Sequence, residues 1–130
     1  MFRLLWVGIG ALPKIRYNQN IFNIIDSDLS HINENAGLMG ISVPEDTFNV
    51  IKKAIEIAKL SDGAFDPSIG PLVSAWGIGT DNARVPSHDE ILQLLPLINY
   101  ADIVLNTNSS TVTLKRSGMI LDLGGIAKGY

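Results

Sequence analysis

Apolar side chains recur at helical spacing in two stretches of the N-terminal half of the chain. In residues 21–33 they occupy positions 21, 24, 25, 29 and 32, which is the pattern of an amphipathic helix. Residues 44–62 carry a broader apolar face and begin with Pro44, which suits a first helical position. Gly63 suits a left-handed cap at the end of this helix, and on its polar face Lys52 and Glu56 are spaced for an i,i+4 ion pair.

A third helix and three short strands are predicted farther along the chain. Ser87 and Glu90 have the spacing of a capping box, and Pro96 is expected to bend or end the helix that follows. The predicted core positions of this helix are Ile91, Leu94, Leu95 and Ile98. The strands are residues 102–105, TVTLKR at 111–116 and MILDLG at 119–124, with turns between them. Helices followed by an antiparallel β meander make the predicted fold α+β.

Composition and charge exclude some classes of protein. The chain has 130 residues, of which 46 % are hydrophobic, enough for one domain with a modest core. A net charge of −3 and scattered basic residues argue against a nucleic-acid partner, because no basic stripe is present. The sequence has no cysteine, which removes disulfides, thiolate metal sites and a cysteine nucleophile.

The first 13 residues, MFRLLWVGIGALP, hold an apolar run after Arg3. The run is too short to span a bilayer but long enough for the core of a signal peptide. Residues 1–20 are therefore predicted to be a leader or a first strand, with a targeting remnant as the alternative. The predicted domain is residues 21–130.

A first candidate for chemistry is the segment DGAFDPSIGPLVSAWG at 62–77, which is expected to form a long ordered loop. Asp66 precedes Pro67, so its backbone is pushed to an extended conformation. Its carboxylate could accept a hydrogen bond from a ring N–H of a heterocyclic ligand, or it could instead close an Asx turn within the loop. Trp76 is expected to be a core anchor.

A second candidate is LDLGGIAKGY at 121–130. A strand leads into Gly124 and Gly125, and Lys128 follows, so bare backbone N–H groups, a helix start and a cation come together. This combination favours phosphate. The spacing is neither that of a Walker loop nor that of a dinucleotide-binding loop, and a glycine-rich strand-to-helix turn is the structural alternative.

These segments together resemble one family. The stretches DGAFDPSIGPLVSAWGIG, VPSHDEI and MILDLGGIAKGY, in this order, resemble the FAD:protein FMN transferases, once called thiamine-biosynthesis lipoproteins. SDLSHINENAG at 27–37 is similar to the S-E-L-S-x-(L/I)-N segment of that family. The resemblance covers residues 21–130 and implies an incomplete ApbE-like fold.

The resemblance implies an activity and a set of site residues. Family members use Mg²⁺ to transfer the FMN half of FAD to a Thr hydroxyl of a target flavoprotein, with AMP as the leaving group. By the resemblance, Ala64, Phe65 and Asp66 lie along the nucleotide part of FAD, and Asp122 holds FAD by a polar contact. The carbonyl of Gly125 is one Mg²⁺ ligand, and Lys128 approaches the pyrophosphate. Phosphoryl transfer needs this kind of positioned charge and metal.

The sequence departs from the family pattern at three places. The remaining Mg²⁺ ligands of the family belong to an acidic, Thr-containing motif that lies beyond the position of Lys128. The M-G-T strand of the family is not recognisable in residues 1–20, and the aromatic residue that packs on the flavin has only Tyr17 and Ile25 as candidate matches. One carbonyl cannot hold Mg²⁺. We therefore expect this chain to be the N-terminal portion of a flavin transferase and not to transfer FMN by itself.

Other functions stay open at this point. Hydrolysis of FAD to FMN and AMP is an alternative in the same chemistry, and a non-catalytic flavin or nucleotide binder is one from another class. Open strand edges would favour a homo-oligomer. Localisation follows family habit only, which is the periplasm or the outer face of a membrane.

Overall fold

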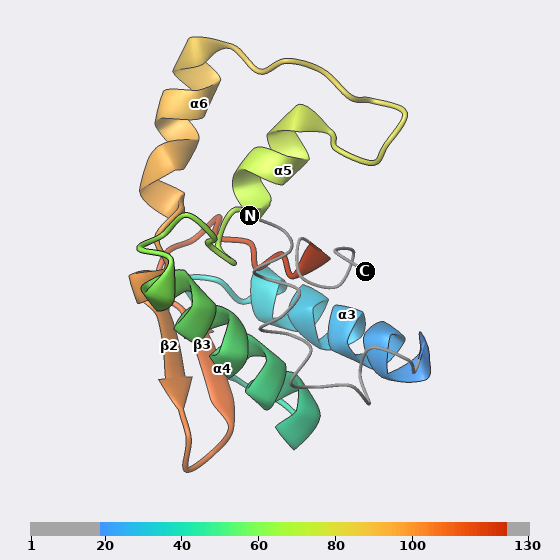
Figure 1. Cartoon of the computed structure of the whole chain (residues 1–130), viewed down its shortest axis with the longest axis vertical. Helices are drawn as coiled ribbons and strands as arrows, with labels where there is room; N and C mark the ends of the chain where they lie inside the picture. The colour runs from blue at the N-terminus through green and yellow to red at the C-terminus, as the bar shows by residue number, and fades with distance from the viewer. Residues whose placement is uncertain (1–18, 125–130) are drawn as a thin grey trace.

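The structure is a computed structural model that describes residues 19–124 (Figure 1). Of the predicted leader or first strand at residues 1–20, residues 1–18, with Trp6 and Tyr17, lie outside the described residues, and residues 19 and 20 belong to the first described helix. The elements are α3 (Gln19–Glu34), β1 (Ile41–Ser42), α4 (Glu45–Leu60), α5 (Gly70–Trp76), α6 (His88–Leu94), η1 (Leu95–Leu97), η2 (Tyr100–Asp102), β2 (Ile103–Asn106) and β3 (Thr111–Leu114). Among residues 19–124, no helix is long and apolar enough to cross a membrane.

The three helices predicted from periodicity are present. α3 and α4 cover the first two apolar patterns, and α4 ends as expected, with Gly63 at a positive φ of 81°. Pro44 lies at the N-cap of α4, one residue before the predicted position. The predicted Lys52–Glu56 ion pair is wrong, because Glu56 instead pairs with Lys53 at 3.8 Å (Nζ to Oε2), one residue closer along the helix.

The sheet has three antiparallel strands in the order β1-β3-β2. The hairpin of β2 and β3 sets Ile103 opposite Leu114 and Leu105 opposite Val112. These four side chains point to one face, since residues two apart share a face. Val104 points to the other face and is exposed. The α+β class and the antiparallel sheet are therefore as predicted.

The core lies between that face of the sheet and the two long helices. α4 contributes eight buried residues, and α3 adds Ile25, Leu29 and Ile32. Figure 1 shows α4 crossing the two strands of the hairpin, with α3 beside it. We call α3, α4, η2, the sheet and residues 61–69 and 119–124 the body.

The predicted third strand at 119–124 is wrong, because β1 takes its place in the sheet. The segment still alternates as a strand would, with Met119, Leu121 and Leu123 buried. Its backbone hydrogen bonds go elsewhere, to the side chain of Asn33 and to the carbonyl of Pro67, as described below. An alternating pattern shows which face is buried but does not identify the hydrogen-bond partner.

The predicted loop at 62–77 is also corrected, since its second half forms α5. α5, α6 and η1 form a projection that we call the arm, residues 70–97, which stands away from the body in Figure 1. The arm has little core of its own. None of the predicted core residues of α6 is buried, and Trp76 is 38 % exposed, so it is no core anchor.

Candidate functional site

The first predicted site segment begins where α4 ends. The hydroxyl of Ser61 accepts a hydrogen bond from the amide of Phe65 at 3.1 Å (N to Oγ), which folds the chain back over the helix end. The Phe65 side chain is buried in the core, whereas Ala64 is exposed. The carbonyls of Ala64 and Phe65 accept no hydrogen bond from the residues that the structure describes. This stretch therefore offers backbone rather than side-chain groups to a ligand.

Asp66 is half-buried, and both its carboxylate oxygens accept hydrogen bonds within the chain. Oδ1 accepts from the amide and the hydroxyl of Ser68, at 2.8 and 2.6 Å. Oδ2 accepts from the amide of Tyr100 at 3.1 Å. The Asx turn named as an alternative for Asp66 is therefore present. The contact with Tyr100 goes further, because it ties the loop to η2.

The second predicted segment lies directly beside the first. The amide of Asp122 donates to the carbonyl of Pro67 at 2.8 Å (N to O), so the two segments share a backbone hydrogen bond. On the other edge of the segment, the amide and carbonyl of Leu121 bond to the side chain of Asn33. The structure thus brings the Asp66 loop and the Asp122 segment together.

Gly70 allows this close approach. A Cβ atom added at Gly70 would lie 2.5 Å from both Cγ2 and the carbonyl oxygen of Ile120. No other residue type fits without displacing one of the two segments. The glycine that follows the loop is therefore explained by the neighbouring segment, which is far away in the sequence.

Asp122 shapes the end of the described chain. Its Oδ1 accepts a hydrogen bond from the amide of Gly124 at 2.7 Å, which is an Asx turn at the point where the predicted glycine-rich motif starts. The side chain is half-buried. Gly125 and Lys128, predicted to meet Mg²⁺ and pyrophosphate, lie outside the described residues.

The described residues do not form a metal site by themselves. Within residues 19–124, no group of three or more His, Asp or Glu side chains lies close enough to hold a metal ion. The predicted Mg²⁺ ligand is Gly125, beyond this part of the chain. Binding of Mg²⁺ therefore stays a prediction.

Sequence reasoning missed Asn33 and Tyr100 as contributors to this region. Asn33 is the last residue of the family-like motif at 27–33, and Tyr100 contributes through its backbone amide. The available signal was an amide side chain near the end of an amphipathic helix. That signal gives no partner, because Leu121 is distant in the sequence.

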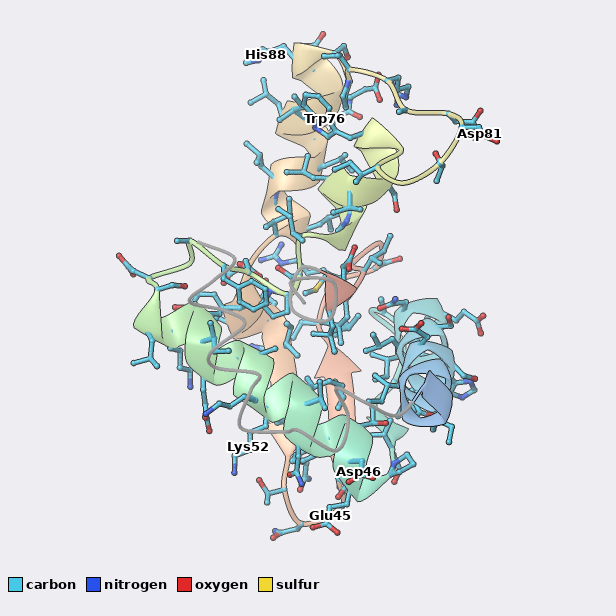
Figure 2. All side chains as sticks on the ribbon, turned by 45° about the vertical axis from the view of Figure 1, so that its right-hand side comes forward. Glu45, Asp46, Lys52, Trp76, Asp81 and His88 are labelled. Atoms are coloured by element: carbon cyan, nitrogen blue, oxygen red, sulfur yellow. The ribbon has the colours of Figure 1, made fainter. Side chains whose placement is uncertain are left out.

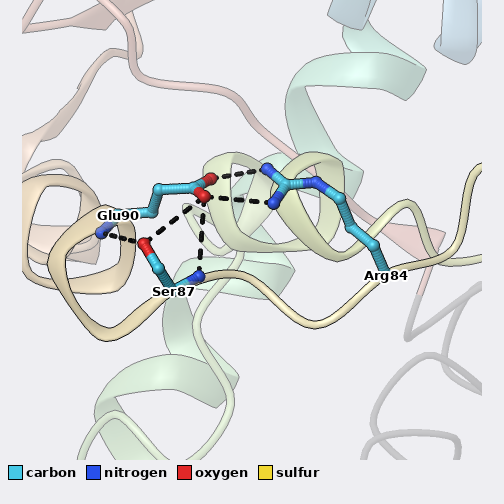
Figure 3. A network of polar contacts seen from close by, with 3 residues as sticks. All are labelled: Arg84, Ser87 and Glu90. Carbon is cyan, nitrogen blue, oxygen red and sulfur yellow. Dashed lines mark hydrogen bonds and ion pairs between the residues drawn. The ribbon is translucent and has the colours of Figure 1, made fainter.

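A separate polar network lies in the arm, and Figure 3 shows it. Two guanidinium nitrogens of Arg84 contact the two carboxylate oxygens of Glu90, at 3.1 and 2.5 Å. Ser87 and Glu90 form the predicted capping box of α6. The hydrogen bond from Arg84 is the main cause that lowers the pKa of Glu90 to about 2. These hydrogen bonds lie within the arm and involve neither Asp66 nor Asp122.

Comparison with known proteins identifies relatives over most of the chain. The ApbE family profile matches residues 15–130. An FAD:protein FMN transferase of Treponema pallidum is 36 % identical over 110 residues, which are 81 % of this chain and 30 % of that protein. One from Klebsiella pneumoniae is 37 % identical over 108 residues, 83 % of this chain and 34 % of that protein. The chain therefore spans about a third of the length of these relatives.

Solved structures agree with the fold. A crystal structure of the ApbE protein of Thermotoga maritima superposes with a TM-score of 0.72 at 38 % identity, covering 78 % of this chain and 33 % of that one. The flavin transferase ApbE of Vibrio cholerae gives 0.70 at 30 % identity, with 79 % and 33 % covered. The architecture of the body and arm is thus part of a larger known fold.

Proposed function

Because this chain belongs to the ApbE family, we propose that it forms the N-terminal part of the FAD site of an FAD:protein FMN transferase. The printed names of its relatives support this activity, and the chain spans about a third of their length. The observation that carries the assignment of the site is the 2.8 Å hydrogen bond from the Asp122 amide to the Pro67 carbonyl. It joins the two segments that the resemblance predicts to bind FAD.

In the proposed reaction, a Thr hydroxyl oxygen of a target flavoprotein bonds to the FMN phosphorus of FAD. The bond from that phosphorus to the bridging oxygen breaks, AMP leaves with this oxygen, and the Thr proton is lost. Ala64 and Phe65 would lie along the nucleotide through their backbone groups, and Asp122 would hold FAD through its remaining carboxylate oxygen. Lys128 would approach the pyrophosphate, where a cation offsets the charge that builds on the leaving group.

Asp66 is proposed to act chiefly by shaping the loop. Its carboxylate already accepts three hydrogen bonds from Ser68 and Tyr100. A carboxylate has about four lone-pair sites, so at most about one is left for a ligand. Removing Asp66 is therefore expected to weaken FAD binding by moving the backbone of Ala64 and Phe65.

Dependence on Mg²⁺ is proposed from the resemblance, with Gly125 as one ligand. A hard divalent cation needs several further oxygen ligands. Within residues 19–124, no group of three or more His, Asp or Glu side chains supplies them, so the proposed reaction assigns no step to the metal. Because the resemblance assigns the other ligands to a motif beyond Lys128, we propose that these 130 residues alone do not transfer FMN.

Two other functions remain as proposals. FAD hydrolysis would release FMN and AMP without a protein acceptor, and a non-catalytic binder would release neither.

Location and oligomeric state are proposed on other grounds. From the location usual in the family, we propose the periplasm or the outer face of a membrane. A homo-oligomer is proposed through β2, an edge strand of the described sheet, and a mass that rises with concentration would support it.

The test is calorimetric titration of the chain with FAD, with and without Mg²⁺. Asp66→Ala and Lys128→Ala are each expected to weaken binding roughly tenfold, the loss expected from one charge-assisted contact or one displaced loop. Matched controls are Asp81→Ala and Lys52→Ala, whose side chains are exposed; Figure 2 shows Asp81 in the loop beyond α5 and Lys52 on α4. Unchanged affinity in both test variants, or FMN transfer by the chain alone, would contradict the proposal.

A further inference from the structure

Asn33 lies in the last turn of α3 and reaches the segment that follows β3. Its neighbour Ile32 is buried in the core, so this end of α3 is packed against the rest of the body. Figure 1 shows this end of α3 beside the red segment near the C-terminus of the described chain. The Asn33 side chain is half-buried and contacts the backbone of Leu121.

The Asn33 amide group takes the place of a strand. Its Oδ1 accepts from the amide of Leu121 at 2.8 Å, and its Nδ2 donates to the carbonyl of the same residue at 3.3 Å. One side chain therefore satisfies both backbone groups of one residue, as a partner strand does in a closely spaced antiparallel pair. The opposite edge is used as well, because the Asp122 amide donates to Pro67.

These contacts set the register of the segment. Leu121 is 3 % exposed and points into the core, so Asp122 must point the other way. A slip by one residue would exchange the two faces and bury the Asp122 carboxylate. It would also remove the hydrogen bond from the Gly124 amide to Asp122, which starts the glycine-rich turn.

We propose that Asn33 is a positioning residue of the FAD site, acting through Leu121 on Asp122 and Gly124. This inference rests on the proposed function, in that the positioned groups are those assigned to FAD. Asn33 itself does not contact the reacting atoms. Its role is to fix where the Asp122 carboxylate and the following glycine-rich turn lie.

Two variants of similar size separate the parts of this contact. Asn33→Leu removes both the donor and the acceptor. Asn33→Asp keeps the acceptor but sets a carboxylate oxygen against the Leu121 carbonyl. The matched control is Asn35→Ala, since Asn35 lies near the same helix end but, among the described residues, its side chain donates only to the nearby carbonyl of His31, at 2.9 Å (Nδ2 to O).

Two measurements are made on each variant: amide hydrogen exchange at Leu121, Asp122 and Gly124 by NMR, and FAD affinity by calorimetry. In Asn33→Leu, exchange at these amides should rise and FAD affinity should fall, each roughly tenfold, for the loss of two hydrogen bonds. Asn35→Ala should change neither. Thermal unfolding establishes that each variant is folded.

Asn33→Asp supplies a readout that a purely structural role would not give. Protonation of the introduced carboxyl at lower pH restores a donor toward the Leu121 carbonyl, and that facing carbonyl favours the protonated form. The FAD affinity of this variant, divided by that of the parent chain, should therefore rise as the pH falls from about 7 to about 5. A pH-independent ratio would contradict the proposed contact.

The outcomes distinguish the two proposals. Unchanged FAD affinity in Asn33→Leu, with faster exchange at Leu121, would overturn the positioning role and leave the proposed function intact. Unchanged exchange at Leu121 would overturn the contact itself. If the parent chain binds no FAD, the proposed function of these segments fails and the positioning role for FAD fails with it, whatever the exchange rates show for the contact.

Discussion

The body and the arm are held together in different ways. In the body, side chains bond to residues far along the chain, as Asn33 does to Leu121 and Asp66 does to Tyr100. In the arm, the side-chain hydrogen bonds span six residues or fewer, from Arg84 to Glu90 at the longest. The arm therefore takes its helix ends from local sequence, whereas the candidate site depends on contacts that only the whole fold creates.

Burial follows the same division. α4 buries eight residues, whereas α6 buries none. Hydrophobic burial is the main stabilising term in folding, so the body should contribute most of the free energy of unfolding. The arm should contribute little to this free energy and should unfold when the body unfolds. Substitutions of the same kind in the two regions test this contrast directly.

The largest difference is expected for truncation of an apolar side chain. Ile51 in α4 is fully buried, and Leu92 in α6 is 50 % exposed. Ile51→Ala should lower the free energy of unfolding by about 2–5 kcal/mol, since it leaves a cavity in the core. Leu92→Ala should change it by less than about 0.5 kcal/mol. Denaturant unfolding followed by circular dichroism measures both, and equal losses would contradict the division into body and arm.

A smaller loss is expected where the arm joins the body. In Gly70→Ala the added methyl group would meet the Ile120 carbonyl at 2.5 Å, and a backbone group cannot rotate away. The resulting strain should cost about 1–3 kcal/mol and should also weaken FAD binding, because Ile120 precedes the Asp122 segment. Ser74→Ala, at an exposed position of the same helix, is the control. If Gly70→Ala is as stable as this control, the close approach of the two segments is wrong.

The same contrast explains what could be predicted from the sequence. The capping box at Ser87, the left-handed Gly63 and the periodicity of α3 and α4 are local signals, and each prediction was confirmed. The core positions assigned to α6 were wrong, because an amphipathic pattern gives a helical face but not a neighbour to cover it. The local signal was sufficient to form the helix, although Ile91 and Leu94 are only half-buried.

The candidate site could be predicted only in part. The sequence motifs identified the two segments, and the structure places them side by side. The strand predicted at residues 119–124 was wrong because alternation does not reveal that the Asn33 side chain and the Pro67 carbonyl replace a strand. Such side-chain-to-backbone contacts leave no periodic signal, so only the folded arrangement shows them.

Loss of the helix cap of the arm should have a local effect. Ser87→Ala removes the hydroxyl that accepts from the Glu90 amide at 3.2 Å, a contact worth about 1 kcal/mol to a helix. Exchange at the Glu90 amide should rise, while exchange in α4 stays unchanged. Ser87→Asn should restore the protection, because Asn is also a good cap. Faster exchange in α4 would mean that the arm stabilises the body.

The smallest effect is expected from the Arg84–Glu90 pair. Hydrogen bonding to Arg84 lowers the pKa of Glu90 from 4.5 to about 2. The pair therefore stabilises the arm fully at pH values above 4.5, the ordinary pKa of the carboxyl. This contribution is lost as the pH falls from 4.5 through about 2, because Glu90 then binds a proton in the folded chain as well. The pair lies at the surface, with side chains 50 % and 43 % exposed, so added salt should weaken it and the stability of the body should not change. Arg84→Met should return the Glu90 pKa, followed by NMR titration, toward its usual range, with no change in global unfolding at pH 7. A pKa that stays near 2 in Arg84→Met would instead assign the shift to the helix cap.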